Sequence, residues 1–446
     1  MKNSVRNPLF RLGACLVLGL CVTLSAQAQT LKDVVQNVVY TNPEVRKEIA
    51  LWRSYRFDVR QGEAGFYPKV DLNAGIGYEE VKNSIADTMG DGLTRRELSL
   101  RLTQNLFHGW FDTHNVERLK ARRDAQALQV EAAAQKVALD TVRAWLEVMR
   151  YQELVKIARQ NIQTHRQILQ QIQLRFDSGL SDEVELDQAK ARLALAESNL
   201  VAQQSKLADA RARYHRMVGH EAPNQMVLPE FDLHDLPPDL ETAMSIALLE
   251  HPTLRAAYAD VAEAKAQYLT RKSAYYPRVD AELSRSWNED INGIKGSNEN
   301  LQAMLRLRYN LYNGGGDKAQ VDSTAALYQQ ATEIRNSARR EVMESLRFSW
   351  NAMNMAENQM SYLEKHITLT RRTLLGYRKQ FSLGRRSLLD VLNTESEYNR
   401  ALVEMTNARY DLLTARYRVL EGLGRLLEDL GVKLDLARNE REYHEQ

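Results

Sequence analysis

The stretch Asn42-Pro43-Glu44-Val45-Arg46 occurs again about 209 residues later as His251-Pro252-Thr253-Leu254-Arg255. The same offset relates Phe66-Tyr67-Pro68-Lys69-Val70-Asp71 to Tyr275-Tyr276-Pro277-Arg278-Val279-Asp280. Farther along, at an offset of about 205, the chain repeats Trp145, Phe176, Gly179 and Gly219 as Trp350, Phe381, Gly384 and Gly424. A period this long exceeds that of a short solenoid repeat. The sequence therefore predicts a tandem duplication in which each copy is a whole structural half.

The duplication divides the 446-residue chain into a few segments. The stretch between the copies contains Pro223, Pro229, Pro237 and Pro238, which is typical of a connector. We predict a signal peptide at 1–28, a first repeat at 29–218 (helix, β-hairpin, long helix, return helix), a connector at 219–239, a second repeat at 240–424 and a C-terminal tail at 425–446.

The amino terminus indicates export from the cytoplasm. Lys2, Arg6 and Arg11 precede an apolar run at 12–24, and Ala26-Gln27-Ala28 supplies small residues for cleavage. The run is too short for a membrane anchor. No other segment approaches 18 consecutive apolar residues, so we expect any membrane-inserted part to consist of β-strands.

Cysteine content and net charge exclude several classes of function. Cys15 and Cys21 both lie in the predicted signal peptide, so we expect the mature chain to contain no disulfide, thiolate metal site or cysteine nucleophile. The formal net charge is +2, and removal of the basic signal peptide brings it close to zero. This balance gives no electrostatic reason to expect a nucleic-acid partner.

Each copy contains two stretches in which apolar and polar residues alternate, as they do in strands with one apolar face. These stretches are 70–79 and 98–103 in the first copy and 279–284 and 303–309 in the second. The polar segments between them, at about 80–96 and 288–300, indicate hairpin loops. Alternation alone also fits a soluble antiparallel sheet with one solvated face, so both interpretations stay open on this pattern.

The remainder has a helical pattern. The segments 109–176 and 314–381 contain no proline, and an unbroken helix of that length would extend about 100 Å. Apolar residues recur in heptads, which predicts packing against other helices. Short turns at 177–181 and 382–386 then lead into return helices at 182–218 and 387–423. The sequence predicts a mainly α protein with a small β part, built from two long antiparallel helical hairpins and four amphipathic strands.

Catalytic and ligand-binding motifs are not found. The nine histidines show no HExxH or comparable metal-ligand spacing, and His165 lies on the heptad seam. Gly314-Gly315-Gly316 lacks both common phosphate-loop patterns, and its counterpart Gly109 stands alone, so we interpret both as strand-to-helix turns. We therefore predict no enzyme activity, no cofactor and no metal site.

In this order, these features resemble the TolC family of outer-membrane efflux and export channels. The resemblance covers about 31–424 and includes the aromatic-Tyr-Pro entry to each first strand and the long helices that follow the second strands. The second reversal, Gly384-Arg385-Arg386-Ser387-Leu388-Leu389-Asp390-Val391-Leu392, is particularly similar to the signature of the family. The resemblance implies a homotrimer in the outer membrane of a Gram-negative bacterium, with a 12-stranded β-barrel continued by a helical barrel through the periplasm. It also implies that the C-terminal tail at 425–446 is periplasmic. Four strands cannot close a barrel, and open sheet edges are not tolerated in lipid, so several chains must combine their strands into one barrel.

This architecture implies a passive, water-filled duct. Its expected barrel-lumen residues are Asp71, Asn73, Arg101, Arg306 and Arg308. The resemblance further implies contact with outer-membrane lipid, a periplasmic adaptor (membrane fusion) protein, and an inner-membrane ABC exporter or proton-driven pump. We favour type I protein secretion, because Asn393-Thr394-Glu395-Ser396-Glu397 is similar to secretion-associated members and the mature chain lacks the acylated cysteine of many drug-efflux members. The alternatives are the outlet of a multidrug efflux pump and, more remotely, a periplasmic adaptor or coiled-coil structural protein.

The resemblance also implies a gate at the periplasmic tip of the helices. Arg386 and Asp390 match charged positions of the family after the second reversal, and Glu185 stands where the first reversal carries an aspartate. We expect Arg386 to pair with Glu185 across neighbouring helices, with Phe381 packing at the turn and three copies of Asp390 around the entrance. Asn393 replaces a second family aspartate, which predicts a less negative aperture. The alternative is that these charges are exposed helix-end pairs, each worth under about 1 kcal/mol.

Overall fold

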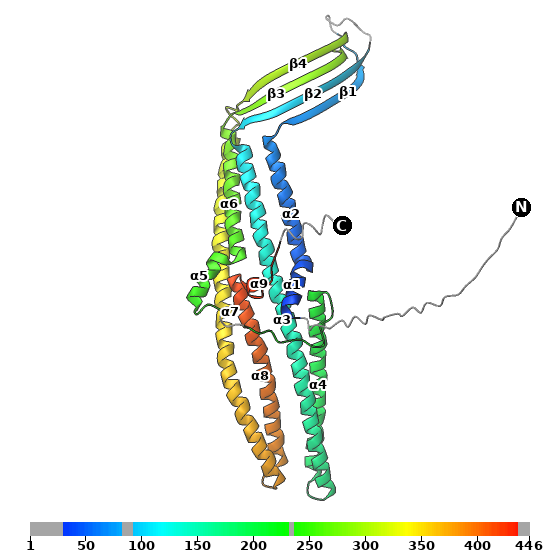
Figure 1. The fold of residues 1–446 in the computed structure, drawn as a ribbon, viewed down its shortest axis with the longest axis vertical. Coiled ribbons are helices and arrows are strands. Elements are labelled where there is room, and N and C mark those ends of the chain that lie inside the picture. Colours follow the sequence, from blue (N-terminus) through cyan, green and yellow to red (C-terminus); the bar gives the residue numbers. More distant parts are fainter. Residues whose placement is uncertain (1–29, 83–91, 232–235, 436–446) are drawn as a thin grey trace, which may run out of the picture.

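The computed structural model describes residues 30–82, 92–231 and 236–435. It is an elongated bundle of long helices with a four-stranded sheet at one end (Figure 1). The predicted signal peptide at 1–28 and the last part of the predicted tail lie outside the described residues. The prediction of a mainly α fold with a small β part is confirmed.

The two halves of the chain contain the same elements in the same order. The first half contains α1 (Leu31–Thr41), α2 (Pro43–Glu63), β1 (Lys69–Glu79), β2 (Leu93–His108), α3 (Phe111–Asp177) and α4 (Glu183–Val218). The second contains α5 (Leu240–Glu250), α6 (Pro252–Lys272), β3 (Arg278–Ile291), β4 (Ile294–Arg308), α7 (Gly316–Ser382) and α8 (Leu388–Leu423). A short helix, α9 (Leu426–Asp429), follows the second half.

The repeated X-Pro pair is a break between two helices. Asn42 caps α2 by accepting a hydrogen bond on Oδ1 from the backbone N of Glu44 at 2.9 Å, and Pro43 occupies the first turn, where its missing N–H costs nothing. In the second half, His251 and Pro252 make the same break, but the His251 side chain forms no cap. Burial lowers the pKa of His251 to about 4, so its imidazole is neutral at pH 7.

The sheet is antiparallel with the strand order β1-β2-β3-β4, and the four predicted strands are confirmed. The predicted loop at 288–300 is wrong, because β3 reaches Ile291 and β4 begins at Ile294. Asn292 and Gly293 alone make the turn, with φ values of 59° and 74° that fit a tight two-residue hairpin. The polar residues that suggested a loop belong to a solvated strand face, where Asn288 pairs with Asn298. In the first hairpin, β2 likewise begins at Leu93, inside the predicted 80–96 loop.

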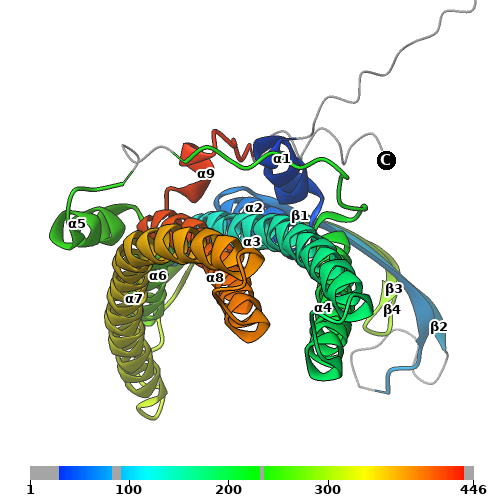
Figure 2. The same cartoon turned by 90° about the horizontal axis from the view of Figure 1, so that it is seen from below.

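The two long helices are confirmed, and each contains 67 residues. With their return helices they follow an arc in the order α7, α8, α3, α4, and α7 and α4 lie at its two ends (Figure 2). Helices α1, α5 and α9 lie on the convex side of the arc. Among the described residues, no helix combines the length and the apolar character needed to cross a membrane.

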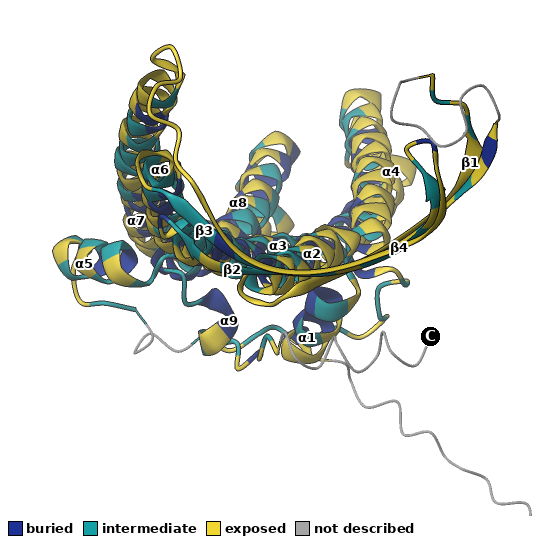
Figure 3. Cartoon of the chain, turned by 90° about the horizontal axis from the view of Figure 1, so that it is seen from above, coloured by how far each residue is buried: buried dark blue, intermediate teal, exposed yellow. Residues whose placement is uncertain are grey.

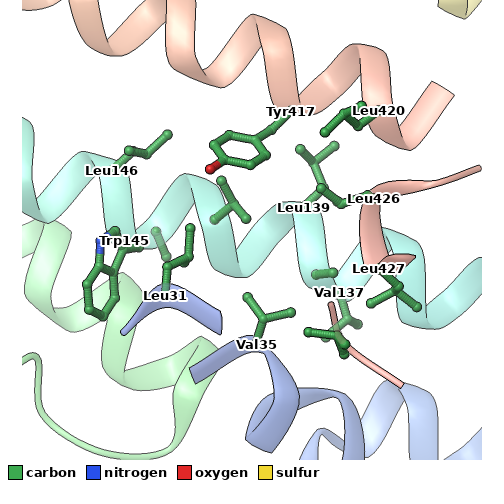
Figure 4. Close-up of a cluster of buried hydrophobic side chains, with 14 of the residues drawn as sticks. Leu31, Val35, Val137, Leu139, Trp145, Leu146, Tyr417, Leu420, Leu426 and Leu427 are labelled. Carbon is green, nitrogen blue, oxygen red and sulfur yellow. The ribbon is translucent and has the colours of Figure 1, made fainter. Parts of the chain in front are cut away.

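The main core lies partway along the bundle, where α1, α3, α8 and α9 meet. Trp145 and Leu146 of α3 pack there with Leu31 of α1 and Tyr417 of α8 (Figure 4). The Trp145 indole N–H donates to the carbonyl of Val227 at 3.3 Å and so attaches the connector to α3. The segment after α8 belongs to this core as well, since Leu426 and Leu427 are buried and Gln36 and Tyr40 donate to the Lys433 carbonyl.

Gly424 ends α8 in a place with no room for a side chain. Its φ is +83°, and an added Cβ would lie 2.9 Å from Cδ of Pro252 and 3.0 Å from Cα of His251. The carbonyl of Gly424 accepts from the Gln135 amide at 2.6 Å, and the next residue, Arg425, forms two bonds of 2.5 and 2.6 Å with Glu250. Gly424 therefore fixes the end of α8 against the α5–α6 break.

The first testable prediction uses the two equivalent glycines. Gly219 ends α4 with φ +90°, but nothing lies within 4 Å of its Cβ position. Gly219→Ala should thus lower the free energy of unfolding only by the strain of a left-handed backbone conformation, about 1–2 kcal/mol. Gly424→Ala adds overlap with Pro252 and His251 and should lower Tm by clearly more in scanning fluorimetry of the purified protein. Equal losses in the two variants would show that the α8 junction is not constrained as described.

Candidate functional site: the polar face of the sheet and the helix tips

The five predicted lumen residues lie on one face of the sheet. Asp71 is paired with Arg101 across β1 and β2, and Arg101 is paired with Ser284 of β3. In β4, Arg306 is paired with Asp280 and Arg308 with Arg278. Successive side chains of a strand point to opposite faces, so these residues and Asn73 share a face with the even-numbered polar residues of β3. Much of the sheet is exposed (Figure 3).

Ion pairs join several of the charges on this polar face. Arg306 donates to one carboxylate oxygen of Glu282 at 2.6 Å, and Arg308 lies 3.6 Å from the other. Arg278 donates to the buried carboxylate of Asp280 at 2.9 Å. Glu282 and Asp280 were absent from our predicted site, although their alternation with apolar neighbours was visible in the sequence.

The opposite face of the sheet is apolar and uncovered. Leu72, Ile76, Leu301 and Leu305 on this face are all exposed, and Leu72 is paired with Leu100 across β1 and β2. Contiguous apolar surface of this kind normally marks contact with a membrane or a protein partner. The face also carries charges that are paired within it, including Arg285 with Glu299 at 3.3 Å.

The two helix turns, which we call the helix tips (178–182 and 383–387), are built alike. Asp182 and Ser387 cap α4 and α8, and Gly179 and Gly384 adopt positive φ values of 72° and 70° before them. A small apolar cluster holds the two hairpins together just above the tips, and Phe381 packs against it. The cluster consists of Ile172, Leu186, Ala189, Leu388 and Leu392.

The predicted pair between Arg386 and Glu185 is not formed within this chain. Arg386 lies 3.7 Å from Asp390 and stacks over the Tyr377 ring at 4.1 Å, and Glu185 accepts a 2.5 Å hydrogen bond from Ser181. Each carboxylate is thus engaged by the residue four positions earlier, which lies in the turn just before the N-cap of its helix. These local contacts form without any approach of the other hairpin, which a pair between Arg386 and Glu185 would need.

Other contacts join the two hairpins above the tips. The Arg192 guanidinium of α4 donates to the side-chain oxygen of Asn393 of α8 at 3.1 Å, so the structure places the last predicted gate residue between hairpins. Arg175 of α3 stacks over Phe381 at 4.9 Å. Sequence reasoning missed both arginines, because arginines are frequent along these helices and nothing in the pattern distinguishes these two. In the part of the chain described here, no cluster of His, Cys, Asp and Glu could hold a metal ion.

Comparisons with known proteins agree with this architecture. The profile of the family described as "Outer membrane efflux protein" matches residues 34–220 and 243–425, one segment in each half. The outer membrane protein TolC of Escherichia coli K12 is 23% identical over 404 residues, covering 87% of this chain and 80% of that protein. The alkaline protease secretion protein AprF of Pseudomonas aeruginosa is 23% identical over 366 residues, covering 79% of this chain and 76% of that protein.

A solved structure shows the same fold. The CmeC outer membrane channel of Campylobacter jejuni superposes with a TM-score of 0.77 at 15% sequence identity, covering 92% of this chain and 88% of that one. The family match extends over most of the chain and includes both halves. The chain therefore belongs to the outer membrane efflux protein family, and it is an outer-membrane channel protein that extends into the periplasm, not an enzyme.

Proposed function

We propose that three copies of this chain form a passive exit duct. The observation that carries this proposal is the open sheet, in which β1 and β4 are edge strands and the apolar face is uncovered. Edge strands carry unpaired backbone N–H and C=O groups, which lipid cannot satisfy. Two copies would supply eight strands, and side chains fill the interior of an eight-stranded barrel. Three copies supply twelve strands, which leave room for a lumen.

The edge of the helical arc supports the same assembly. Helix α7 exposes an apolar stripe with heptad spacing, which consists of Leu327, Ile334, Phe348, Met355, Tyr362 and Leu369. Phe348 and Tyr362 are 60% and 72% exposed, which is unusual for large apolar side chains on a helix that packs on its other side. A heptad stripe fits a partner helix. The α4 edge of a second copy is the complementary end of the arc (Figure 2).

For the transport system, we favour type I protein secretion. In this proposal the duct joins a periplasmic adaptor and an inner-membrane ABC exporter, and outer-membrane lipid surrounds the sheet. The similarity to the protease secretion protein AprF and the segment 393–397 support it. The alternative is the outlet of a proton-driven multidrug efflux pump, which the family description supports equally well. The lumen residues carry charges of both signs and do not distinguish the two kinds of cargo.

We further propose that the helix tips form the gate. Asp390 and Glu185 lie in the first turns of α8 and α4, where three copies of each would surround the entrance. Arg386 contacts Asp390 and Tyr377 in this chain. If Arg386 exchanged Asp390 for Glu185 of a neighbouring helix, the new ion pair would link adjacent hairpins around the entrance. Asn393, bonded to Arg192, adds no negative charge to this aperture.

The assembly prediction concerns mass in mild detergent. The purified protein should have the mass of a trimer, and Met355→Glu with Tyr362→Glu should shift it toward monomer because two charges enter the α7 stripe. Asn354→Glu with Ser361→Glu is the matched control, since these polar positions are exposed on the same helix but lie off the stripe. A monomeric or dimeric wild type, or a control that dissociates as readily as the stripe variant, would contradict the proposed contact.

The gate prediction concerns single-channel conductance in planar bilayers. Arg386→Ser with Glu185→Ala removes one positive and one negative charge at the tips, so the current should increase while the trimer persists. Lys190→Ser with Asp187→Ala is the control, because it removes an exposed pair of 3.1 Å on α4 without changing net charge. An unchanged current in the tip variant, or the same increase in the control, would contradict a gate at the helix tips.

The cargo prediction separates the two transport systems. Deletion of this protein should remove one or a few large proteins from the cell surface or medium, with sensitivity to dyes and detergents nearly unchanged. Re-expression of the wild type should restore those proteins. Normal secretion combined with strong sensitivity to dyes and detergents would instead favour the efflux pump.

A further inference from the structure

A cavity of about 330 Å³ lies between α3, α4 and α8, on the side of the tips toward the core. We call it the hairpin groove, because α4 and α8 belong to different hairpins. Its apolar lining includes Leu154, Leu195 and Val403, and its charged lining consists of Arg192 and Arg400, with no aspartate or glutamate. This volume is at the lower end of the range for small-molecule sites. The groove combines apolar walls with positive charge, as a site for a small organic anion does.

The two arginines of the groove have no carboxylate partner in the described chain. Arg192 donates only to the neutral amide oxygen of Asn393, and Arg400 takes part in none of the ion pairs there. The carboxylates of Glu197 and Glu395 on the same two helices are engaged by Arg166 and Arg378. Arg192 is half-buried and Arg400 is exposed, so both guanidinium groups are free to reach an anion in the groove through charge-assisted hydrogen bonds.

A buried imidazole provides independent evidence for a ligand. His165 of α3 lines the groove, is 4% exposed, and has no hydrogen-bond partner at Nδ1 among the described residues. Burial, followed by the charges of Arg192 and Arg378, lowers the pKa of His165, so the ring is neutral at pH 7. Buried polar atoms are rarely left unpaired, because each costs free energy.

We propose that the hairpin groove binds a small amphiphilic carboxylate. The carboxylate group lies between the Arg192 and Arg400 side chains, and the short apolar chain lies against the leucine and valine walls. A bound anion contacts both hairpins and replaces the missing acidic partner of the two arginines. The proposal concerns a ligand on the helical wall of one chain, so it does not depend on the type of cargo that the duct carries.

The test uses hexanoate and purified full-length protein, with binding measured by titration calorimetry at pH 7. Hexanoate should bind with saturable heat, whereas acetate, which lacks the chain, and hexanol, which lacks the charge, should bind at least about ten-fold more weakly. Arg192→Gln with Arg400→Gln should weaken hexanoate binding by about ten-fold or more, since both charge-assisted bonds are lost. Arg371→Gln with Arg372→Gln makes the same change in net charge on the exposed surface of α7 and should leave affinity unaltered.

The outcomes that overturn the proposal are equally definite. Absence of saturable hexanoate binding, equal binding of hexanol, or retained affinity in the Arg192→Gln with Arg400→Gln variant would each exclude the site. If that double variant fails to fold, Arg400→Gln alone and the comparison of the three ligands on the wild type decide the matter. Arg400→Lys keeps the charge and should preserve most of the affinity.

Discussion

The open sheet is the constraint on which the rest of the molecule depends. Helices satisfy their own backbone groups, but β1 and β4 each leave one edge unpaired. Within the chain, the β2–β3 pairing joins the hairpin of the first half to that of the second. A contact between β4 and β1 of another copy would again join a second half to a first half. The duplicated chain thus already contains, at its centre, the kind of junction that its two edges require.

Much of the fold could be predicted because periodicity is a local property of the sequence. The heptads and the absence of proline located α3 and α7, and alternation located all four strands. The β3–β4 turn was missed, although Asn292-Gly293 is a strong hairpin signal, because polar residues of one strand face resembled a loop. The partners of Arg386 were missed for another reason. Which carboxylate it meets depends on the separation of two hairpins, which one sequence does not specify.

Stability is distributed unevenly along the bundle. The large core lies where α1, α3, α8 and α9 meet, and Gly424 fixes the end of α8 there. Above the tips, the hairpins are held by a small apolar cluster and by single contacts such as Arg175 with Phe381. Regions with fewer buried apolar contacts open at lower free-energy cost. The proposed gate would therefore lie in the less tightly packed part of the bundle.

The two tips also show how the copies diverged around one geometry. Ser181 and Arg386 occupy equivalent positions in the repeat, as do Glu185 and Asp390, and each first residue contacts the carboxylate four positions later. In the first copy the partner is a neutral hydroxyl, so the negative charge of Glu185 is not compensated by it. In the second copy Arg386 compensates Asp390 and also stacks on Tyr377. The first tip therefore presents a carboxylate bonded to a neutral hydroxyl and the second an ion pair, and the proposed exchange of partners between neighbouring hairpins would use this chemical difference.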